Sequence, residues 1–327
     1  MSETLCTLTF DDVVDGLRKL SRPYHAAYLA MYSSWYRGII RDPRLMMVPI
    51  DDHLVHRGDG IFEAFKAVEG ALYLLDRHLA RLERSAAIST IPLPCERDEL
   101  RRIILATARA AEAPDCVVRL FVSRGPGGYT TNPYECPASQ LYIVVTTLQR
   151  PSPDQYAQGA TLQTSAIPIK PTLFAGVKSC NYLPNVLMKK EAVDAGVDYT
   201  VSLDERGFLA EGPTENIGIV TAKRELLVPR FERVLRGTTV TRALELARPL
   251  LGTGELARIQ EADITPLQVR EAAEIMMFGT TFDIMPVVRY DGHSIGTGRP
   301  GPVATRLLAL LEEDARHGEG VRTPIGE

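Results

Sequence analysis

The sequence predicts an α+β fold built from two sheet-and-helix domains, and three observations predict this class. Strand-like and helix-like segments alternate without the regular rhythm of a parallel α/β sheet. The chain has 327 residues, about twice the length of an average domain. Hydrophobic residues make up 45% of the chain and no internal repeat is visible, so each half can bury its own core.

The first forty residues are expected to be helical. Thr9 is followed three residues later by Asp12, a capping-box signal, and Phe10, Val13 and Leu17 recur at helical spacing. We therefore predict a helical N-terminal extension over residues 1–47.

Residues 48–147 are predicted to form a small N-terminal α/β domain. A Glu69-Gly70 turn joins two apolar runs into a hairpin, and Asp76 is expected to cap the helix that follows. The expected strands are 61–68, 71–75, 117–123 and 141–147, the expected helices are 77–87 and 96–113, and a Gly/Pro-rich loop covers 124–139.

A proline-rich interdomain linker is predicted at 148–154, followed by a larger C-terminal domain over 155–327. A cap at Thr265 starts one of its helices, Gly196 ends another, and Asp291-Gly292 reads as a hairpin turn. The expected strands are 161–167, 199–203, 208–210, 216–220, 275–278 and 287–290, and the expected helices are 183–195, 240–251, 266–272 and 302–315.

Charge and composition limit the partners. The net charge is −4, and the 37 Lys and Arg residues are scattered, which gives no electrostatic footprint for nucleic acid or anionic lipid. We expect a small-molecule partner. No leader-like or membrane-spanning apolar stretch is visible, and five cysteines at unrelated spacings suit reduced thiols, so a cytoplasmic protein is expected. His53 and His56 lack further ligands, so no metal site is expected.

Two glycine–threonine junctions suggest a phosphate site. Residues 237–239 and 279–281 both read Gly-Thr-Thr, and exposed N–H groups with threonine hydroxyls suit an anion. Each junction alone is more typical of an ordinary turn. Together with Arg81 on a polar helix stripe they favour phosphate binding. The loop that starts at Arg124 matches neither a dinucleotide nor a P-loop pattern.

Lys178 and Glu211 are candidate catalytic groups. A lysine in a partly apolar setting can have a depressed pKa and form an imine with a carbonyl compound. A lone lysine or glutamate is more often a solvated surface charge, and the residues alone leave both interpretations open.

The sequence around these residues resembles the class IV, fold type IV pyridoxal-phosphate enzymes, which include branched-chain aminotransferases, D-amino-acid aminotransferases and aminodeoxychorismate lyases. The resemblance covers roughly 48–311. The matching motifs are Lys178-Ser-Cys-Asn-Tyr-Leu-Pro-Asn, Leu203-Asp-Glu-Arg-Gly-Phe-Leu-Ala-Glu-Gly-Pro-Thr-Glu-Asn-Ile, Arg57-Gly-Asp-Gly-Ile-Phe-Glu, Leu74-Leu-Asp-Arg-His-Leu-Ala-Arg-Leu, Leu235-Arg-Gly-Thr-Thr and Gly279-Thr-Thr.

The resemblance implies a two-domain fold type IV enzyme with pyridoxal 5′-phosphate. Lys178 would hold the cofactor as an internal aldimine and then shuttle the substrate proton. Glu211 would pair with the pyridine nitrogen, and Tyr182 with the phenolic oxygen. The implied phosphate ligands are Arg81, Thr238, Thr239 and Thr280.

The substrate site follows the family less closely. D-amino-acid aminotransferases bind the substrate carboxylate with an Arg-x-His pair, and here Tyr129 and Thr131 stand at those positions. Phe62 and Phe65 could line the substrate pocket, and packing explains both equally well. The tentative substrate residues are Arg57, Phe62, Phe65, Arg124, Tyr129 and Thr281.

The leading prediction is an aminotransferase that moves an amino group between an amino acid, or an amine, and a 2-oxo acid through pyridoxamine phosphate. The alternative is a lyase that eliminates pyruvate from aminodeoxychorismate. A catalytically silent binder of the cofactor is a third possibility, which intact Lys178, Tyr182 and Glu211 disfavour. The resemblance also implies a homodimer.

Overall fold

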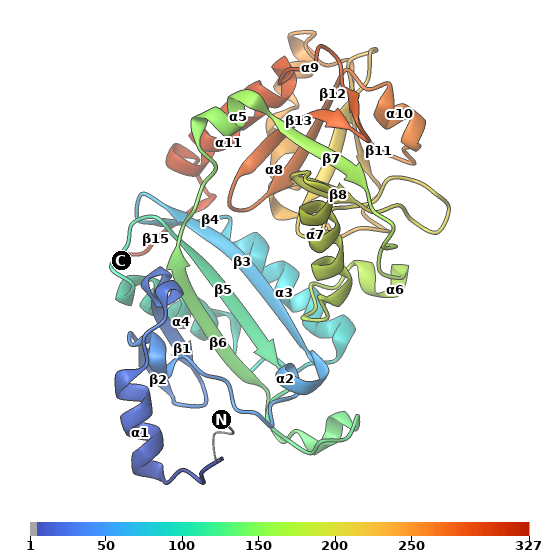
Figure 1. Ribbon diagram of the computed structural model, residues 1–327. Coiled ribbons are helices and arrows are strands. Elements are labelled where there is room, and N and C mark those ends of the chain that lie inside the picture. Colours follow the sequence, from blue (N-terminus) through green and yellow to red (C-terminus); the bar gives the residue numbers. More distant parts are fainter. Residues whose placement is uncertain (1–4, 327) are drawn as a thin grey trace.

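The computed structural model describes residues 5–326, which form two β-sheets with helices packed against them (Figure 1). The first sheet has seven strands in the order β15-β4-β3-β5-β6-β1-β2, and all its pairings are antiparallel. Its strands are β1 (Tyr28–Ser33), β2 (Gly38–Ile40), β3 (Gly60–Val68), β4 (Ala71–Tyr73), β5 (Cys116–Ser123), β6 (Gln140–Thr147) and β15 (Arg322–Pro324).

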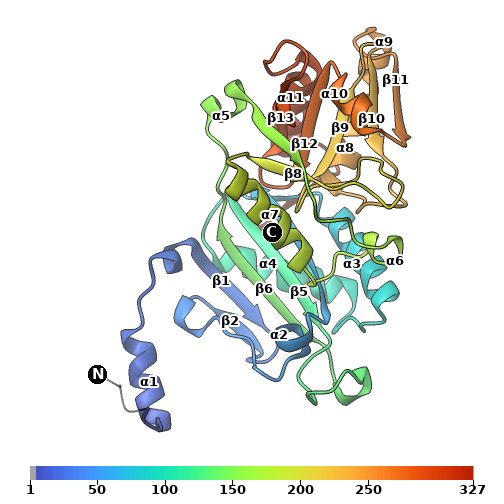
Figure 2. The same cartoon turned by 45° about the vertical axis from the view of Figure 1, so that its right-hand side comes forward.

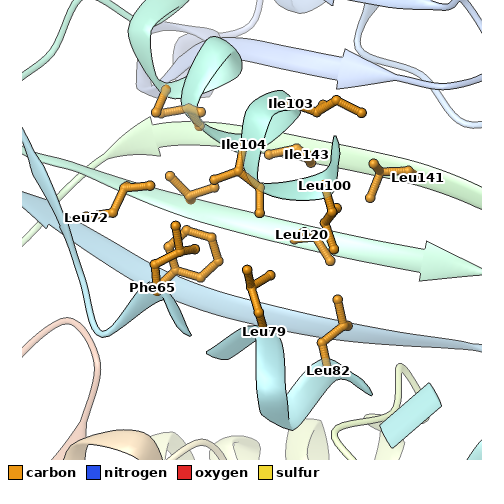
Figure 3. Packing of buried hydrophobic residues seen from close by; sticks show 14 of the residues in the cluster. Phe65, Leu72, Leu79, Leu82, Leu100, Ile103, Ile104, Leu120, Leu141 and Ile143 are labelled. Atoms are coloured by element: carbon orange, nitrogen blue, oxygen red, sulfur yellow. The ribbon is translucent and has the colours of Figure 1, made fainter. Parts of the chain in front are cut away.

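Helices α3 (Leu75–Ser89) and α4 (Arg97–Ala110) cover one face of this sheet. Their apolar side chains meet those of β3 and β5 in one buried core, in which Phe65, Leu79, Leu100 and Leu120 interlock (Figure 3). The two helices lie behind the strands in Figure 1. The opposite face carries several half-buried side chains, among them Phe62 and Phe121.

The second sheet pairs strands in the order β11-β10-β9-β12-β13-β7-β8, with β14 beside β13. Its pairing is mixed, since β10 with β11, β13 with β7, and β7 with β8 run parallel. Its strands are β7 (Ala160–Thr164), β8 (Tyr199–Val201), β9 (Asn216–Val220), β10 (Glu225–Pro229), β11 (Arg258–Ala262), β12 (Glu274–Gly279), β13 (Asp283–Tyr290) and β14 (His293–Ser294).

Helices α8 (Thr238–Leu246) and α11 (Pro302–His317) pack together on one face of the second sheet, where they share a core with β12. Val269, in helix α10 (Pro266–Arg270), belongs to a second core on the other face. The remaining helices are α1 (Phe10–Lys19), α2 (His53–Arg57), α5 (Pro153–Gln158), α6 (Thr172–Ala175), α7 (Leu183–Ala195), α9 (Pro249–Gly252) and α10 (Pro266–Arg270). None of the helices within residues 5–326 is long and apolar enough to cross a bilayer.

Several expected local signals are confirmed. Thr9 and Asp12 form the capping box of α1, and Thr265 forms another with Gln268 at the start of α10. Gly196 ends α7 with a φ of 66°, in the left-handed region that glycine favours. Glu69 and Gly70 both have positive φ, as a two-residue hairpin turn requires.

The expectation of forty helical residues at the N-terminus is wrong beyond Lys19. The chain continues through a 3₁₀ turn into β1, which pairs with β6 inside the first sheet. Tyr28–Ser33 becomes a strand by pairing with β6, and it buries Ala30 and Met31 against the sheet. Helix α1 lies apart from the sheets, at the periphery in both views (Figures 1 and 2).

Other expectations also need correction. Asp76 does not cap α3, which begins at Leu75; its carboxylate instead accepts hydrogen bonds from Arg97 and Arg101. Leu209 makes only an isolated bridge with Leu203, so the strand expected over 208–210 does not form. Strands β10, β11 and β15 were not expected, and β15 brings the end of the described chain back to β4 of the first sheet.

The chain passes from the first sheet to the second between the end of β6 at Thr147 and the start of α5 at Pro153. The division into domains at 47, 147 and 154 stays a prediction. The first sheet extends beyond the predicted N-terminal domain at both ends of the chain, since β1, β2 and β15 all belong to this sheet.

Candidate active site

Lys178 lies between α6 and α7, in a segment that pairs with the start of β3. Its carbonyl accepts a hydrogen bond from the Phe62 N–H at 2.9 Å, and the Cys180 N–H donates to the Gly60 carbonyl at 2.8 Å. The Lys178 N–H also donates to the Ser85 hydroxyl of α3 at 3.3 Å. Because β4 pairs only with the far end of β3, this edge is open to the lysine segment. The backbone of Lys178 is therefore fixed by two elements of the first sheet domain.

The Lys178 amine sits between two aromatic side chains. Its Nζ lies 3.5 Å from the Tyr182 hydroxyl and 4.4 Å from the centre of the Phe62 ring. The two rings meet edge to face at 5.1 Å. Burial, assisted by the charge of Arg81, lowers the pKa of Lys178 to about 8. A usable fraction of the amine is therefore neutral, and so nucleophilic, near neutral pH.

Glu211 lines the same small cavity as Lys178 and Tyr182. One carboxylate oxygen accepts the Leu235 N–H at 3.0 Å. Burial raises the pKa of Glu211 to about 7, although the Leu235 N–H and the charge of Lys178 oppose this rise. The carboxyl group would become fully ionised beside a cationic partner such as a protonated ring nitrogen.

Thr238 and Thr239 are the first two residues of α8, where N–H groups have no partner within the helix. Gly237 precedes them, and a Cβ there would lie 1.9 Å from the Oδ1 of Asn216, so only glycine fits. The Asn216 amide donates to the Leu235 carbonyl at 2.8 Å, and this bond keeps the Asn216 side chain against Gly237. The helix start is thus arranged as an anion site.

Arg81 reaches this helix start through a buried chain of polar groups. Its Nε and Nη2 donate to Glu63 at 2.8 and 2.7 Å, and its Nη1 donates to the Arg236 carbonyl at 3.2 Å. Glu63 also contacts the Nδ1 of His78 at 2.7 Å, and the other ring nitrogen lies 3.1 Å from the Thr238 hydroxyl. The chain joins β3 and α3 to the start of α8.

Charge fixes the direction of these hydrogen bonds. Burial would raise the pKa of Glu63, but Arg81 and His78 hold it down at about 2, so the carboxylate is ionised and accepts. Burial lowers the pKa of His78 against the effect of Glu63, so the ring is neutral. Its Nδ1–H then donates to Glu63, and its Nε2 accepts from the Thr238 hydroxyl.

Sequence reasoning included Glu63 and His78 in the family-like motifs but gave them no role. The spacing of these residues in the sequence already indicated that they share a buried site. Glu63 falls on the alternating inward face of β3, between Ile61 and Phe65, and His78 and Arg81 share one face of α3 at i, i+3 spacing. A carboxylate at such a buried position requires partners.

The second threonine pair lies in the turn between β12 and β13. The Thr280 hydroxyl is 3.4 Å from the Ala64 carbonyl of β3. Thr281 lines a cavity of about 540 Å³ that extends over the half-buried face of the first sheet, together with Arg119 and Phe121 of β5. Arg119 has one hydrogen bond to a neutral group, the Thr146 hydroxyl at 2.7 Å, and burial lowers its pKa. Arg119 was not predicted as a site residue.

Two tentative substrate residues are engaged elsewhere. The Arg124 guanidinium contacts the Asp59 carboxylate at 2.5 Å and donates to the Ser89 and Thr90 carbonyls. Phe65 faces α3 inside the first core and is fully buried, so its role is in packing and not in lining the substrate pocket.

Arg57, the last residue of α2, lies against Tyr129 in the loop that follows β5. Arg57 donates to the carbonyls of Tyr129, Thr130 and His56. The Tyr129 ring stacks on His56 at 4.8 Å and is 59% exposed. In the part of the chain that the structure describes, no cluster of three metal-ligating side chains occurs.

The comparisons with known proteins agree with this geometry. The sequence model of the family described as Amino-transferase class IV matches residues 60–290. The chain belongs to this family. It is 43% identical over 293 residues to the chloroplastic D-amino-acid transaminase of Arabidopsis thaliana, covering 89% of this chain and 78% of that protein. It is 30% identical to a putative branched-chain-amino-acid aminotransferase of Methanocaldococcus jannaschii, covering 85% of this chain and 95% of the relative.

Solved structures show the same fold. A branched-chain amino acid aminotransferase of the organism abbreviated T.th., solved with pyridoxamine 5′-phosphate, superimposes with a TM-score of 0.85 at 26% identity, over 91% of this chain and 99% of that one. The protein is therefore a fold type IV, pyridoxal-phosphate-dependent transaminase.

The side chains present fit this cofactor. A lysine with a lowered pKa suits a carbonyl carbon, and a carboxyl group in the same cavity suits a pyridine nitrogen. The start of α8, kept open by Gly237, suits a phosphate. The three groups therefore match, in their chemistry, the three distinct parts of pyridoxal phosphate: its carbonyl carbon, its ring nitrogen and its phosphate.

Proposed function

We propose that this transaminase takes α-amino acids as donors and 2-oxo acids as acceptors, with D-amino acids among the donors. One observation carries amino transfer: the Lys178 amine, with a pKa near 8, stands 3.5 Å from the Tyr182 hydroxyl in the cavity that Glu211 lines. The similarity to a D-amino-acid transaminase over 89% of the chain supports the D-series as the first donors to test.

The cofactor would be held by residues from both sheets. Glu211 would pair with the pyridine nitrogen, Tyr182 with the phenolic oxygen, and Lys178 with the carbonyl carbon. When bound, the cofactor supplies an electron sink for the carbanion that forms at the substrate Cα. The proposed phosphate ligands are Arg81, Thr238, Thr239 and Thr280.

Lys178 would act as the acid–base group of the reaction. Once released by an incoming amine, its Nζ would accept the proton from the substrate Cα and deliver it to the C4′ carbon of the cofactor. A base works best when its pKa lies near the working pH, and burial places the pKa of Lys178 at about 8. The Tyr182 hydroxyl and the Phe62 ring hold the amine in one position during this exchange.

Arg119 is our proposed ligand for the substrate carboxylate, together with backbone N–H groups of the turn that carries Thr281. Arg119 and Thr281 share one cavity, and within residues 5–326 the half-buried Arg119 guanidinium has a single neutral hydrogen-bond partner, which favours an anion. Arg124 is less suitable because Asp59 already neutralises it. Phe62 and Phe121, stacked at 5.9 Å on the same face, would contact the substrate side chain.

A panel of single donors tests the proposal. The holoenzyme is incubated with individual D-amino acids, L-amino acids and amines, and the absorbance of the bound cofactor is followed. D-amino acids are expected to convert the bound cofactor to its pyridoxamine form, which is seen as a loss of the original absorbance. Bleaching by L-amino acids alone would contradict the D-donor assignment. Pyruvate release from aminodeoxychorismate, with no bleaching by any donor, would favour the lyase alternative.

We also propose that the chain is a homodimer located in the cytoplasm. A group of exposed apolar side chains on α7 supports association, since Leu183, Val186 and Val193 are each more than half exposed and a clustered apolar surface marks an interaction site. Light scattering on the purified protein tests the first part: a mass near 36.1 kDa would contradict the dimer.

A further inference from the structure

A buried ion pair joins the two sheets beside the proposed substrate site. The Nζ of Lys66 in β3 lies 2.5 Å from both carboxylate oxygens of Asp283, at the start of β13. The Lys66 side chain is 1% exposed and that of Asp283 is 3% exposed. The two residues are 217 positions apart in the chain, so the pair links its two halves.

Asp283 closes the turn that carries Thr280 and Thr281. It has a φ of 60°, so the backbone at this end of the turn has left-handed geometry. Two further bonds tie the turn to neighbouring elements. The Thr280 hydroxyl donates to the Ala64 carbonyl at 3.4 Å, and the Tyr156 hydroxyl donates to the Phe282 carbonyl at 2.8 Å. The ion pair is the only charged contact among these three.

The pair lies on the same face of the first sheet as Arg119. Ala64 and Lys66 are two residues apart in β3, so their side chains point to one face. Ala64 is directly opposite Arg119 of β5. Across the interface, Thr281 is two residues before Asp283 and shares a cavity with Arg119. The Lys66–Asp283 contact therefore ties the end of the Thr280–Thr281 turn to β3, the strand next to Arg119.

Stability alone is a weak reason for such a pair. Two charges removed from water lose solvation that their attraction repays only in part, and apolar side chains of similar size are often as stabilising. A contact between fixed charges does, however, define one position for a turn that ends in left-handed backbone geometry.

We propose that Lys66 and Asp283 are positioning residues that hold the Thr280–Thr281 turn in register with Arg119, and so set the affinity for the substrate carboxylate and the cofactor phosphate. This inference rests on the proposed function of that turn. Neither residue touches the reacting atoms in this account.

The test removes both charges together. In Lys66→Met/Asp283→Asn no lone buried charge remains, and Asn tolerates left-handed backbone. The expected result is a KM about tenfold higher or more for both donor and acceptor, a smaller change in kcat, and weaker binding of pyridoxamine phosphate to the apoprotein, followed by its fluorescence. Lys66→Arg keeps the pair and should keep most of the affinity.

A matched control distinguishes an effect on the position of the turn from an effect on the stability of the protein. Arg242→Met/Asp314→Asn removes another ion pair, 2.6 Å long and mostly buried, which joins α8 to α11 and does not contact the turn. It should lower the Tm with KM unchanged. A Lys66→Met/Asp283→Asn protein with a lower Tm but unchanged KM values and pyridoxamine-phosphate affinity would overturn the proposal.

Two further outcomes remain decisive. If the double variant does not fold, Asp283→Glu takes its place in the test. This substitution lengthens the acidic side chain by one methylene and keeps both charges. It should still raise KM, and an unchanged KM would overturn the proposal. If the wild type transfers no amino group from any donor, the proposed function fails, and the affinity for pyridoxamine phosphate alone decides whether the pair positions the turn.

Discussion

The Thr238 hydroxyl lies 3.1 Å from the Nε2 of His78, whose Nδ1 is 2.7 Å from the ionised carboxylate of Glu63. Because His78 is neutral, its Nε2 must accept, and the single hydroxyl proton of Thr238 is used on it. A phosphate dianion can only accept hydrogen bonds. Thr238 can therefore serve a phosphate through its backbone N–H but not through its side chain.

This arrangement predicts different effects at two neighbouring threonines. Thr238→Val should change the affinity for pyridoxamine phosphate by less than about threefold, but should lower stability by about 1–3 kcal/mol because the Nε2 of His78 loses its partner. Thr239→Val should weaken binding about tenfold, since its hydroxyl has no competing acceptor among the described hydrogen bonds. Fluorescence titration and thermal melts separate the two effects. Equal losses of affinity would show that both hydroxyls bind the phosphate.

The stability of the protein at acid pH should depend on the ionisation of Glu63. Its pKa in the folded state is about 2, below that of an exposed glutamate, so its ionised form stabilises the fold above about pH 4.5. That contribution, on the order of 3 kcal/mol, is lost as the pH falls from about 4.5 towards 2. Glu63→Gln should therefore be much less stable than wild type at pH 7 and closer to it at pH 3. Denaturant unfolding at both pH values checks this, and a difference that does not change with pH would contradict it.

Lys178 should make the apoprotein less stable at neutral pH. Burial lowers the pKa of Lys178 to about 8, below that of a free lysine, so ionisation opposes folding. The cost is complete below about pH 8 and disappears as the pH rises towards about 10.5. Lys178→Met apoprotein should melt at a higher temperature than wild type at pH 7, by a margin that shrinks at pH 10. A variant that melts below wild type at pH 7 would contradict the assigned burial.

The two arginines on β5 and its loop give a matched pair for the substrate carboxylate. Arg119→Gln should raise KM for donor and acceptor by about tenfold or more, because a charge-assisted contact to the carboxylate is lost. Arg124→Gln removes the same charge but breaks a contact to Asp59, so KM should change little while the Tm falls. The opposite pattern would assign the carboxylate to Arg124.

Much of the fold follows from local signals. The capping boxes at Thr9 and Thr265 and the hairpin turn at Glu69-Gly70 depend only on neighbouring residues, and each was predicted. Strands β1 and β15 depend on distant partners. Tyr28–Ser33 becomes a strand because β6 offers an edge, and Arg322–Pro324 because β4 does. Such pairings leave no local pattern.

The site shows the same division. Lys178, Tyr182 and Glu211 were predicted through motifs that resemble the family, and the structure brings them to one cavity. Arg119 and the Lys66–Asp283 pair were missed because their meaning comes from the packing of the second sheet on the first. Glu63 and His78 belong to matched motifs, but their hydrogen-bond chain is visible only once α8 lies beside α3.

Glu211 should be essential for turnover but not for cofactor capture. Glu211→Gln keeps a polar group of the same size and removes the negative charge that would keep the pyridine nitrogen protonated. We expect kcat to fall about a hundredfold or more, near 3 kcal/mol of transition-state stabilisation, with yellow holoenzyme still forming. Glu211→Asp, which keeps the charge, should recover part of the rate. A Glu211→Gln enzyme with wild-type kcat would contradict the role.

The most direct test of the account is the single-turnover half-reaction of Lys178→Ala. The variant is loaded with pyridoxal phosphate and mixed with D-alanine, and conversion of the bound cofactor to its pyridoxamine form is followed by absorbance beside the wild type. If Lys178 moves the Cα proton, the variant should convert at least about 10⁴-fold more slowly, and an added small primary amine should restore part of the rate. Conversion at the wild-type rate without added amine would contradict the central claim.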